Sequence, residues 1–123
     1  MPPKKNPLGL NALQLKTLTL LQALAKLPDH ASPGETAGEI RVDGLPHPHG
    51  DHFHLGEAVV ASRDATGLNN PAAWTALERK GLIRSLFPEA VVLTEAGLAY
   101  DTGLADAIIH RADQGSGALP GEF

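Results

Sequence analysis

The residues best suited to chemistry are four histidines within eight positions, His47, His49, His52 and His54, with Asp51 among them. Imidazole nitrogens bind zinc, nickel and copper well, and an adjacent carboxylate can add an oxygen ligand. Side chains two positions apart on a strand share a face, so His52 and His54 would point the same way if residues 52–55 form a strand. One interpretation of the five residues is a site for zinc or another divalent transition metal.

Two further interpretations of this histidine run stay open. Histidine titrates near neutral pH, so protonation could alter the segment in a pH-responsive role, or the side chains could be ordinary solvated residues. The spacing His47-x-His49-x-Asp51-His52 also matches the zinc motif of metallo-β-lactamase-like hydrolases. Those enzymes are much longer αββα sandwiches with distant ligands, so the match is interpreted as a coincidence.

Other signatures of catalysis are missing from the sequence. It holds no Ser–His–Asp set, glycine-rich phosphate loop or paired carboxylates in a usable context, so the chain is expected not to be an enzyme. It has no cysteine, which excludes disulfides and thiol chemistry and fits a reducing compartment. With no long apolar run and no signal peptide, a cytoplasmic protein that does not contact membranes is expected, with no cofactor other than the metal considered above.

The elements that must position these residues follow from hydrophobic spacing and capping signals. The 123 residues suffice for one domain, expected over residues 11–112, between a flexible arm (1–10) and a disordered tail (113–123). Asn11 and Gln14 can form a capping box, and Asn70 followed by Pro71 is typical of a helix start. Helices are predicted over residues 11–27, 56–64, 70–80 and 94–100, the last resuming over 103–111. Strands are predicted over residues 39–43, 52–55, 83–86 and 90–93.

Two motifs lie in the second half of the chain: Leu77-x-x-x-Gly81-Leu82-Ile83 and Leu93-Thr94-Glu95-x-Gly97. A helix that ends in the first motif, followed by a two-stranded ribbon that ends in the second, resembles the winged-helix domains of MarR-type bacterial regulators. The resemblance implies a mostly α fold with a small β component (α+β). It would be a winged helix-turn-helix with an extra His-rich β-hairpin or loop before the second helix.

The resemblance also implies that the chain is a transcriptional regulator that binds double-stranded DNA. The helix over residues 70–80 would enter the major groove, with Ala73, Trp74 and Leu77 facing the core and residues 84–89 forming the wing. A homodimer through residues 11–27 and 95–111 is expected. Lys4 and Lys5 could add phosphate contacts. The expected DNA-contacting residues are Arg63, Asn69, Asn70, Thr75, Arg79, Lys80 and Arg84.

The charge of the predicted interface keeps two alternatives open. The formal net charge is −4, and residues 55–100 hold four basic and five acidic side chains, whereas phosphate binding depends on Lys and Arg. The predicted wing tip, Phe87-Pro88-Glu89, has no base. The first alternative is a protein-interaction or dimerisation module on the same scaffold, without DNA binding and with Phe87 and Pro88 as an apolar edge. The second is a metal-responsive variant that uses the hairpin over residues 47–54.

Overall fold

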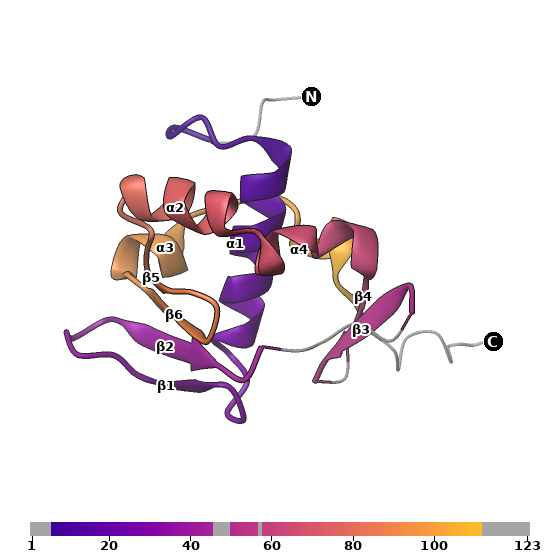
Figure 1. The fold of residues 1–123 in the computed structure, drawn as a ribbon, viewed down its shortest axis with the longest axis horizontal. Helices are drawn as coiled ribbons and strands as arrows, with labels where there is room; N and C mark the ends of the chain where they lie inside the picture. The colour runs from indigo at the N-terminus through magenta and orange to yellow at the C-terminus, as the bar shows by residue number, and fades with distance from the viewer. Residues whose placement is uncertain (1–5, 46–49, 57, 112–123) are drawn as a thin grey trace.

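The computed structural model of the protein describes residues 6–45, 50–56 and 58–111. The elements in chain order are α1 (Ala12–Leu24), β1 (Ala31–Pro33), β2 (Ile40–Asp43), β3 (His52–Leu55), β4 (Ala58–Ala61), the 3₁₀ turns η1 (Ser62–Asp64) and η2 (Thr66–Asn69), α2 (Pro71–Arg79), β5 (Ile83–Leu86), β6 (Ala90–Leu93), α3 (Glu95–Ala99), α4 (Ala105–Ile108) and β7 (His110–Arg111). α1 runs through the middle of the molecule, and the β3–β4 hairpin lies apart from strands β1, β2, β5 and β6 (Figure 1).

The prediction of a mostly α-helical fold is wrong. Over the described residues the protein has seven strands beside four α-helices, so the fold is mixed α and β. One sheet has four strands in the order β1-β2-β6-β5, and the other has three in the order β3-β4-β7. Every strand pair in both sheets is antiparallel.

The main local error concerns residues 56–64, which were predicted to be the first helix of the helix-turn-helix. Among the described residues of this range, Ala58–Ala61 form strand β4 and Ser62–Asp64 form η1, and β4 pairs with both β3 and β7. Four consecutive apolar residues cannot be assigned to helix or strand by periodicity alone, and the β-branched Val59 and Val60 favour the strand. Gly56, at φ +59°, turns the chain between β3 and β4. The predicted helix-turn-helix therefore lacks its first helix in the described structure.

Helix α1 begins as predicted. The side chain of Asn11 accepts a hydrogen bond from the Gln14 backbone N–H at 2.8 Å, and the Gln14 side chain accepts one from the Asn11 N–H at 3.0 Å. This reciprocal bonding satisfies two N–H groups that the first turn would otherwise leave unpaired. α2, η2, α3 and α4 all contact α1, so its broad apolar face is covered within the chain. Its completely buried leucines are Leu18, Leu20, Leu21 and Leu24.

Residues 6–10, which the sequence analysis assigned to a flexible arm, are bonded to the rest of the domain. The Asn6 side chain bonds to both the N–H and the carbonyl of Leu10, at 3.0 and 2.9 Å, and accepts a hydrogen bond from the Tyr100 hydroxyl. That hydroxyl in turn accepts one from the Leu8 N–H at 3.2 Å. Lys4, Lys5 and the tail predicted over residues 113–123 lie outside the described residues.

The two sequence motifs of the second half pack against each other. Thr94 donates its backbone N–H to the carbonyl of Leu82 at 3.1 Å and its hydroxyl to the carbonyl of Gly81 at 2.7 Å. The same hydroxyl accepts from the Gly97 N–H at 3.1 Å and so caps α3. A Cβ atom at Gly97 would lie 1.9 Å from the Leu82 carbonyl oxygen. Glycine is therefore required where α3 approaches the backbone that follows α2.

The last predicted helix is shorter than expected. α3 ends at Ala99, as the prediction over 94–100 indicated, but α4 covers only Ala105–Ile108. The two residues that follow Ile109 form β7, which pairs with β4 at the open edge of the β3–β4 hairpin. In the part of the chain that the structure describes, no helix has both the length and the apolar character needed to cross a bilayer.

Candidate nucleic-acid interface

The helix proposed to contact DNA, α2, forms as predicted. Asn70 is its N-cap, with its Oδ1 accepting a hydrogen bond from the Ala72 N–H at 2.9 Å, and Pro71 occupies the first helical position. Gly81 has φ +78°, as expected for the residue that ends a helix in the left-handed conformation. The side-chain oxygen of Asn70 is therefore already engaged in a hydrogen bond inside the protein.

The two faces of α2 are well separated. Ala73, Trp74 and Leu77 are buried, which confirms their predicted inward orientation. On the opposite side, Thr75 and Arg79 are one helical turn apart and both are exposed. Ala72 is exposed beside them and Ala76 is partly exposed. The outward face of α2 therefore carries small side chains, a hydroxyl and a guanidinium, together with the exposed Glu78, whose carboxylate accepts a hydrogen bond from the Ser85 N–H at 3.2 Å.

Three of the predicted phosphate-binding cations remain available near this face. Arg79 and Lys80 are exposed at the C-terminal end of α2, and Arg63 is exposed on η1, which leads through η2 into α2. Within the described residues no ion pair involves any of the three. The acid next to Arg63 is already neutralised, because Asp64 pairs with Lys16 at 2.8 Å. Asn69 is also exposed, at the end of η2.

Arg84 differs from these three cations because it is already paired with acidic side chains. Its Nη1 lies 2.5 Å from Glu39 Oε2 and its Nη2 lies 3.9 Å from Glu35 Oε1. Glu39 is held in place by the Thr36 N–H, which donates to its other oxygen at 3.2 Å. Since the Glu39 side chain is only 9% exposed, the pair joins the turn before β2 to strand β5 across the sheet. The prediction of Arg84 as a phosphate contact overlooked this acid, 45 residues away in sequence.

A double-mutant cycle tests the Arg84–Glu39 pair. We expect Glu39→Gln and Arg84→Gln to be coupled by about 1 kcal/mol in the free energy of unfolding, measured by urea denaturation. This is the upper end for exposed pairs, because the carboxylate is buried whereas the guanidinium is 42% exposed. The control cycle is Arg41 with Asp43, which are 3.5 Å apart and both about half exposed. Additive effects at Arg84 and Glu39 would contradict the structural role given to this pair.

The loop between β5 and β6 has the three residues predicted for the wing tip. The first of them, Phe87, packs edge-on against Trp74 with ring centroids 4.8 Å apart. Phe87 thus belongs to the core margin and does not form the apolar edge suggested for a protein-interaction module. Among the described residues, the large apolar side chain that is exposed is Leu86, at 46%.

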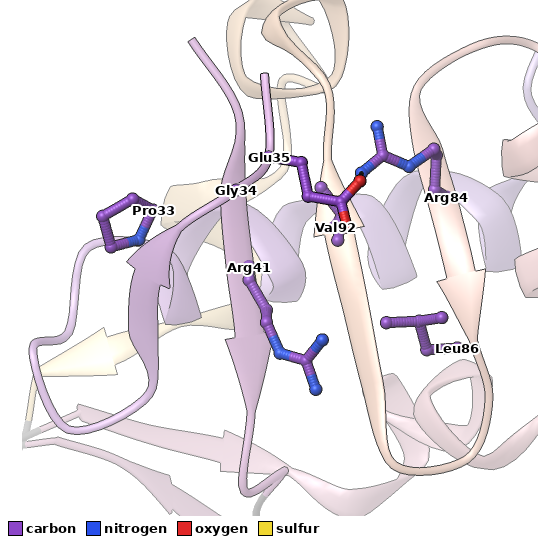
Figure 2. Close-up of a pocket in the computed structure, with 7 residues that line it drawn as sticks. All are labelled: Pro33, Gly34, Glu35, Arg41, Arg84, Leu86 and Val92. Carbon is purple, nitrogen blue, oxygen red and sulfur yellow. Dashed lines mark ion pairs between the residues drawn. The ribbon is translucent and has the colours of Figure 1, made fainter. Parts of the chain in front are cut away.

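A shallow cleft lies on the outer face of the four-stranded sheet. Its volume is about 290 Å³. The register aligns Arg41, Val92 and Arg84 in one row across β2, β6 and β5. Figure 2 shows the side chains of Arg84 and Glu35 directed toward each other, and the guanidinium of Arg41 directed away from them. This cleft was not predicted from the sequence, although polar and apolar residues alternate along β2. The lining residues are Pro33, Gly34, Glu35, Arg41, Arg84, Leu86 and Val92.

The histidine run is described only in part, since His47 and His49 lie outside the described residues. His52 and His54 lie on β3, with ring centroids 5.1 Å apart, and Asp51 Oδ1 is 3.2 Å from His52 Nδ1. The strand predicted over residues 52–55 is therefore present with the same bounds. In the described ranges, no group of three or more histidine or carboxylate side chains converges to hold a metal ion.

Comparison with known proteins adds no relative to this description. A scan against models of protein families found no match, and neither did searches of curated proteins and of solved structures. The resemblance to MarR-type regulators therefore stays a prediction from the two motifs.

Proposed function

We propose that the protein binds double-stranded DNA through the outward face of α2. The observation that carries the proposal is the uncovered stripe of Ala72, Thr75 and Arg79, with Lys80 exposed at the end of α2, Arg63 exposed on η1 and no acid paired to any of the three cations in the described structure. Small side chains allow the helix backbone to approach a groove closely, and the cations would lie on phosphates. A role in transcription regulation and a cytoplasmic location are parts of the same proposal.

Different residues near the start of α2 would contact different base edges. Bidentate pairing with adenine needs both the oxygen and the nitrogen of an asparagine side chain. Asn70 Oδ1 accepts from the Ala72 N–H, so Asn70 keeps only its amide nitrogen as a donor. Asn69 is exposed and would be the residue that reads adenine, while Thr75 and Ala72 would contact thymine methyl groups.

The experiment is fluorescence anisotropy of a labelled mixed-sequence duplex, titrated with untagged protein from low to physiological salt. If Arg63, Arg79 and Lys80 each neutralise one phosphate, the logarithm of the association constant should fall with the logarithm of salt concentration with a slope of about −2.7 per chain. Replacing any one of them by glutamine should reduce the magnitude of that slope by about 1.

Two variants serve as matched controls for that titration. Lys26→Gln removes one exposed charge after the far end of α1, and Arg84→Gln removes a cation already paired with Glu39. Neither should change the slope. The proposal fails if the duplex is not bound at low salt, or if the triple variant of Arg63, Arg79 and Lys80 binds as the wild type does.

The exposed Leu86 beside the outer-sheet cleft favours a second candidate function, protein interaction. Four of the leucines of α1 that motivated a dimer through residues 11–27, Leu18, Leu20, Leu21 and Leu24, are buried in their own chain, which favours a different surface for a homodimer. We propose the outer face of the sheet. Sedimentation equilibrium should then show a mass that rises with concentration in the wild type and stays monomeric in Leu86→Lys. A wild-type mass that stays monomeric at all concentrations contradicts the dimer.

A further inference from the structure

The four-stranded sheet has two edge strands, β1 and β5, and the backbone groups at the two edges are covered in different ways. The carbonyl of Leu82, just before β5, accepts a hydrogen bond from the N–H of Thr94, just after β6, at 3.1 Å. Successive residues of an antiparallel strand direct their backbone groups to opposite sides. The N–H and carbonyl groups of Ile83 and Ser85 therefore point away from β6, toward the open side of the sheet.

At the β5 edge, one of these outward N–H groups is covered by a side chain from α2. The Ser85 N–H donates to Glu78 Oε2 at 3.2 Å, and this hydrogen bond is exposed to solvent. No ion pair within the described residues involves Glu78, so this hydrogen bond is what holds its carboxylate at the edge. A glutamate side chain can rotate into another rotamer without any change in the backbone, so the cover is removable.

The opposite edge, β1, is closed by the backbone itself. The carbonyl of His30 accepts a hydrogen bond from the Asp43 N–H at 3.1 Å, so the outward residues of β1 are Ala31 and Pro33. The Ala31 N–H donates to the Leu27 carbonyl at 2.9 Å, and proline has no N–H. Within the described residues, β1 therefore offers no open donor, and β5 is the edge of this sheet where a further strand can add.

We propose that the edge of β5 is a strand-addition surface for a second copy of this chain, and that Glu78 controls access to it. An antiparallel pairing of two β5 strands centred on Arg84 places Ile83 of each copy opposite Ser85 of the other. Each outward N–H then meets a carbonyl, so the edge is complementary to itself, as a two-fold dimer requires. The two Arg84 side chains beside the axis do not oppose this pairing, because Glu39 neutralises each within its own chain. This edge is distinct from the outer face of the sheet, and its use does not depend on DNA binding by α2.

The test is sedimentation equilibrium of the untagged protein and its Glu78→Ala variant over a range of concentrations. Glu78→Ala should self-associate at concentrations about tenfold lower than the wild type, because the Ser85 N–H no longer has to leave a charged acceptor. The matched control is Glu89→Ala, which removes the exposed carboxylate of the loop between β5 and β6 and should sediment as the wild type does. Adding Ser85→Pro to Glu78→Ala should restore the wild-type mass, since proline removes the N–H from the edge.

Hydrogen exchange at the Ser85 amide locates the association without the proline variant. In Glu78→Ala this amide should exchange rapidly in dilute solution and become protected as the protein concentration rises. A dimer through the outer face of the sheet would leave the exchange of this amide unchanged, so the two surfaces are distinguished. The proposal is overturned if Glu78→Ala sediments as the wild type does, if its association leaves the Ser85 amide unprotected, or if association persists in the folded double variant. Circular dichroism of each variant checks that the fold is intact.

Discussion

Replacing Gly97 with alanine should lower the free energy of unfolding by about 3 kcal/mol or more, a large fraction of the roughly 5–15 kcal/mol that typically stabilises a native protein. The added Cβ would lie 1.9 Å from the carbonyl oxygen of Leu82 and 2.9 Å from its carbonyl carbon. Both are backbone atoms, so no side-chain rotation can relieve the clash. The same carbonyl accepts the Thr94 N–H, and moving it would disturb the cap of α3.

The sign of this effect makes the test decisive. In an unobstructed helix, alanine in place of glycine stabilises by about 0.5–1 kcal/mol, because glycine loses more backbone entropy on folding. Urea denaturation of Gly97→Ala should give the opposite sign. The matched control is Ala96→Ser, which adds one atom at the preceding, exposed position of α3 and should stay within about 0.5 kcal/mol of the wild type. A Gly97→Ala variant as stable as the wild type would refute the close approach of α3 to Leu82.

Replacing Trp74 with alanine should cost about 4 kcal/mol of unfolding free energy. The Trp74 ring is completely buried in the core, where it packs edge-on against Phe87. Its indole N–H donates to the carbonyl of Gly67 at 3.0 Å, a buried hydrogen bond between α2 and η2. Alanine would leave a cavity and remove one of the two hydrogen bonds that the Gly67 carbonyl accepts, the other coming from the Asn70 N–H at 3.1 Å, so the loss should exceed that from an aliphatic residue of the core.

Trp74→Phe separates the two contributions. It keeps an aromatic ring beside Phe87 and removes the N–H donor, so about 2 kcal/mol of the loss should remain. Far-UV circular dichroism must follow unfolding, because Trp74 is the one tryptophan of the chain and its variants have none to report fluorescence. A Trp74→Ala variant within about 1 kcal/mol of the wild type would contradict the burial of the ring.

The elements that sequence reasoning located correctly are those set by short-range chemistry. The capping box of Asn11 and Gln14, the Asn70–Pro71 start of α2 and the left-handed Gly81 at its end all depend on bonds or dihedral angles within a few residues. The strands over residues 83–86 and 90–93 were likewise predicted with the bounds observed, since alternation and a tight loop identify a hairpin.

The errors occur where a short apolar segment had two possible partners. Residues 58–61 are compatible with a helix packed on α1 or with a strand, and pairing with β3 on one side and β7 on the other selects the strand. β7 comes from residues about fifty positions later in the chain, so no local pattern around Val60 indicates it. The mostly α prediction came from the resemblance to winged-helix domains together with the helix expected over residues 56–64, and no strand was predicted where β1 lies.

The candidate site shows the same difference between features set by the local sequence and features set by contacts between distant segments. Capping signals and helical spacing predicted α2 and its inward residues, and the resemblance to helix-turn-helix regulators predicted Thr75 and Arg79, which are exposed. It also placed His52 and His54 on a common strand face. It could not find that Glu39 neutralises Arg84, because the two residues meet only when β2 and β5 pair with opposite edges of β6.

By itself, the sequence determined where α1 begins, where α2 and the β5–β6 hairpin begin and end, and which face of α2 is apolar. Tertiary structure decided that residues 58–61 are a strand, that the leucines of α1 are covered within one chain, and that Arg84 is held by Glu39. The physical reason is the distance along the sequence over which each kind of interaction acts. Caps, turns and side-chain spacing act through bonds over three or four residues, whereas burial, strand pairing and ion pairing depend on segments that only the complete fold brings together.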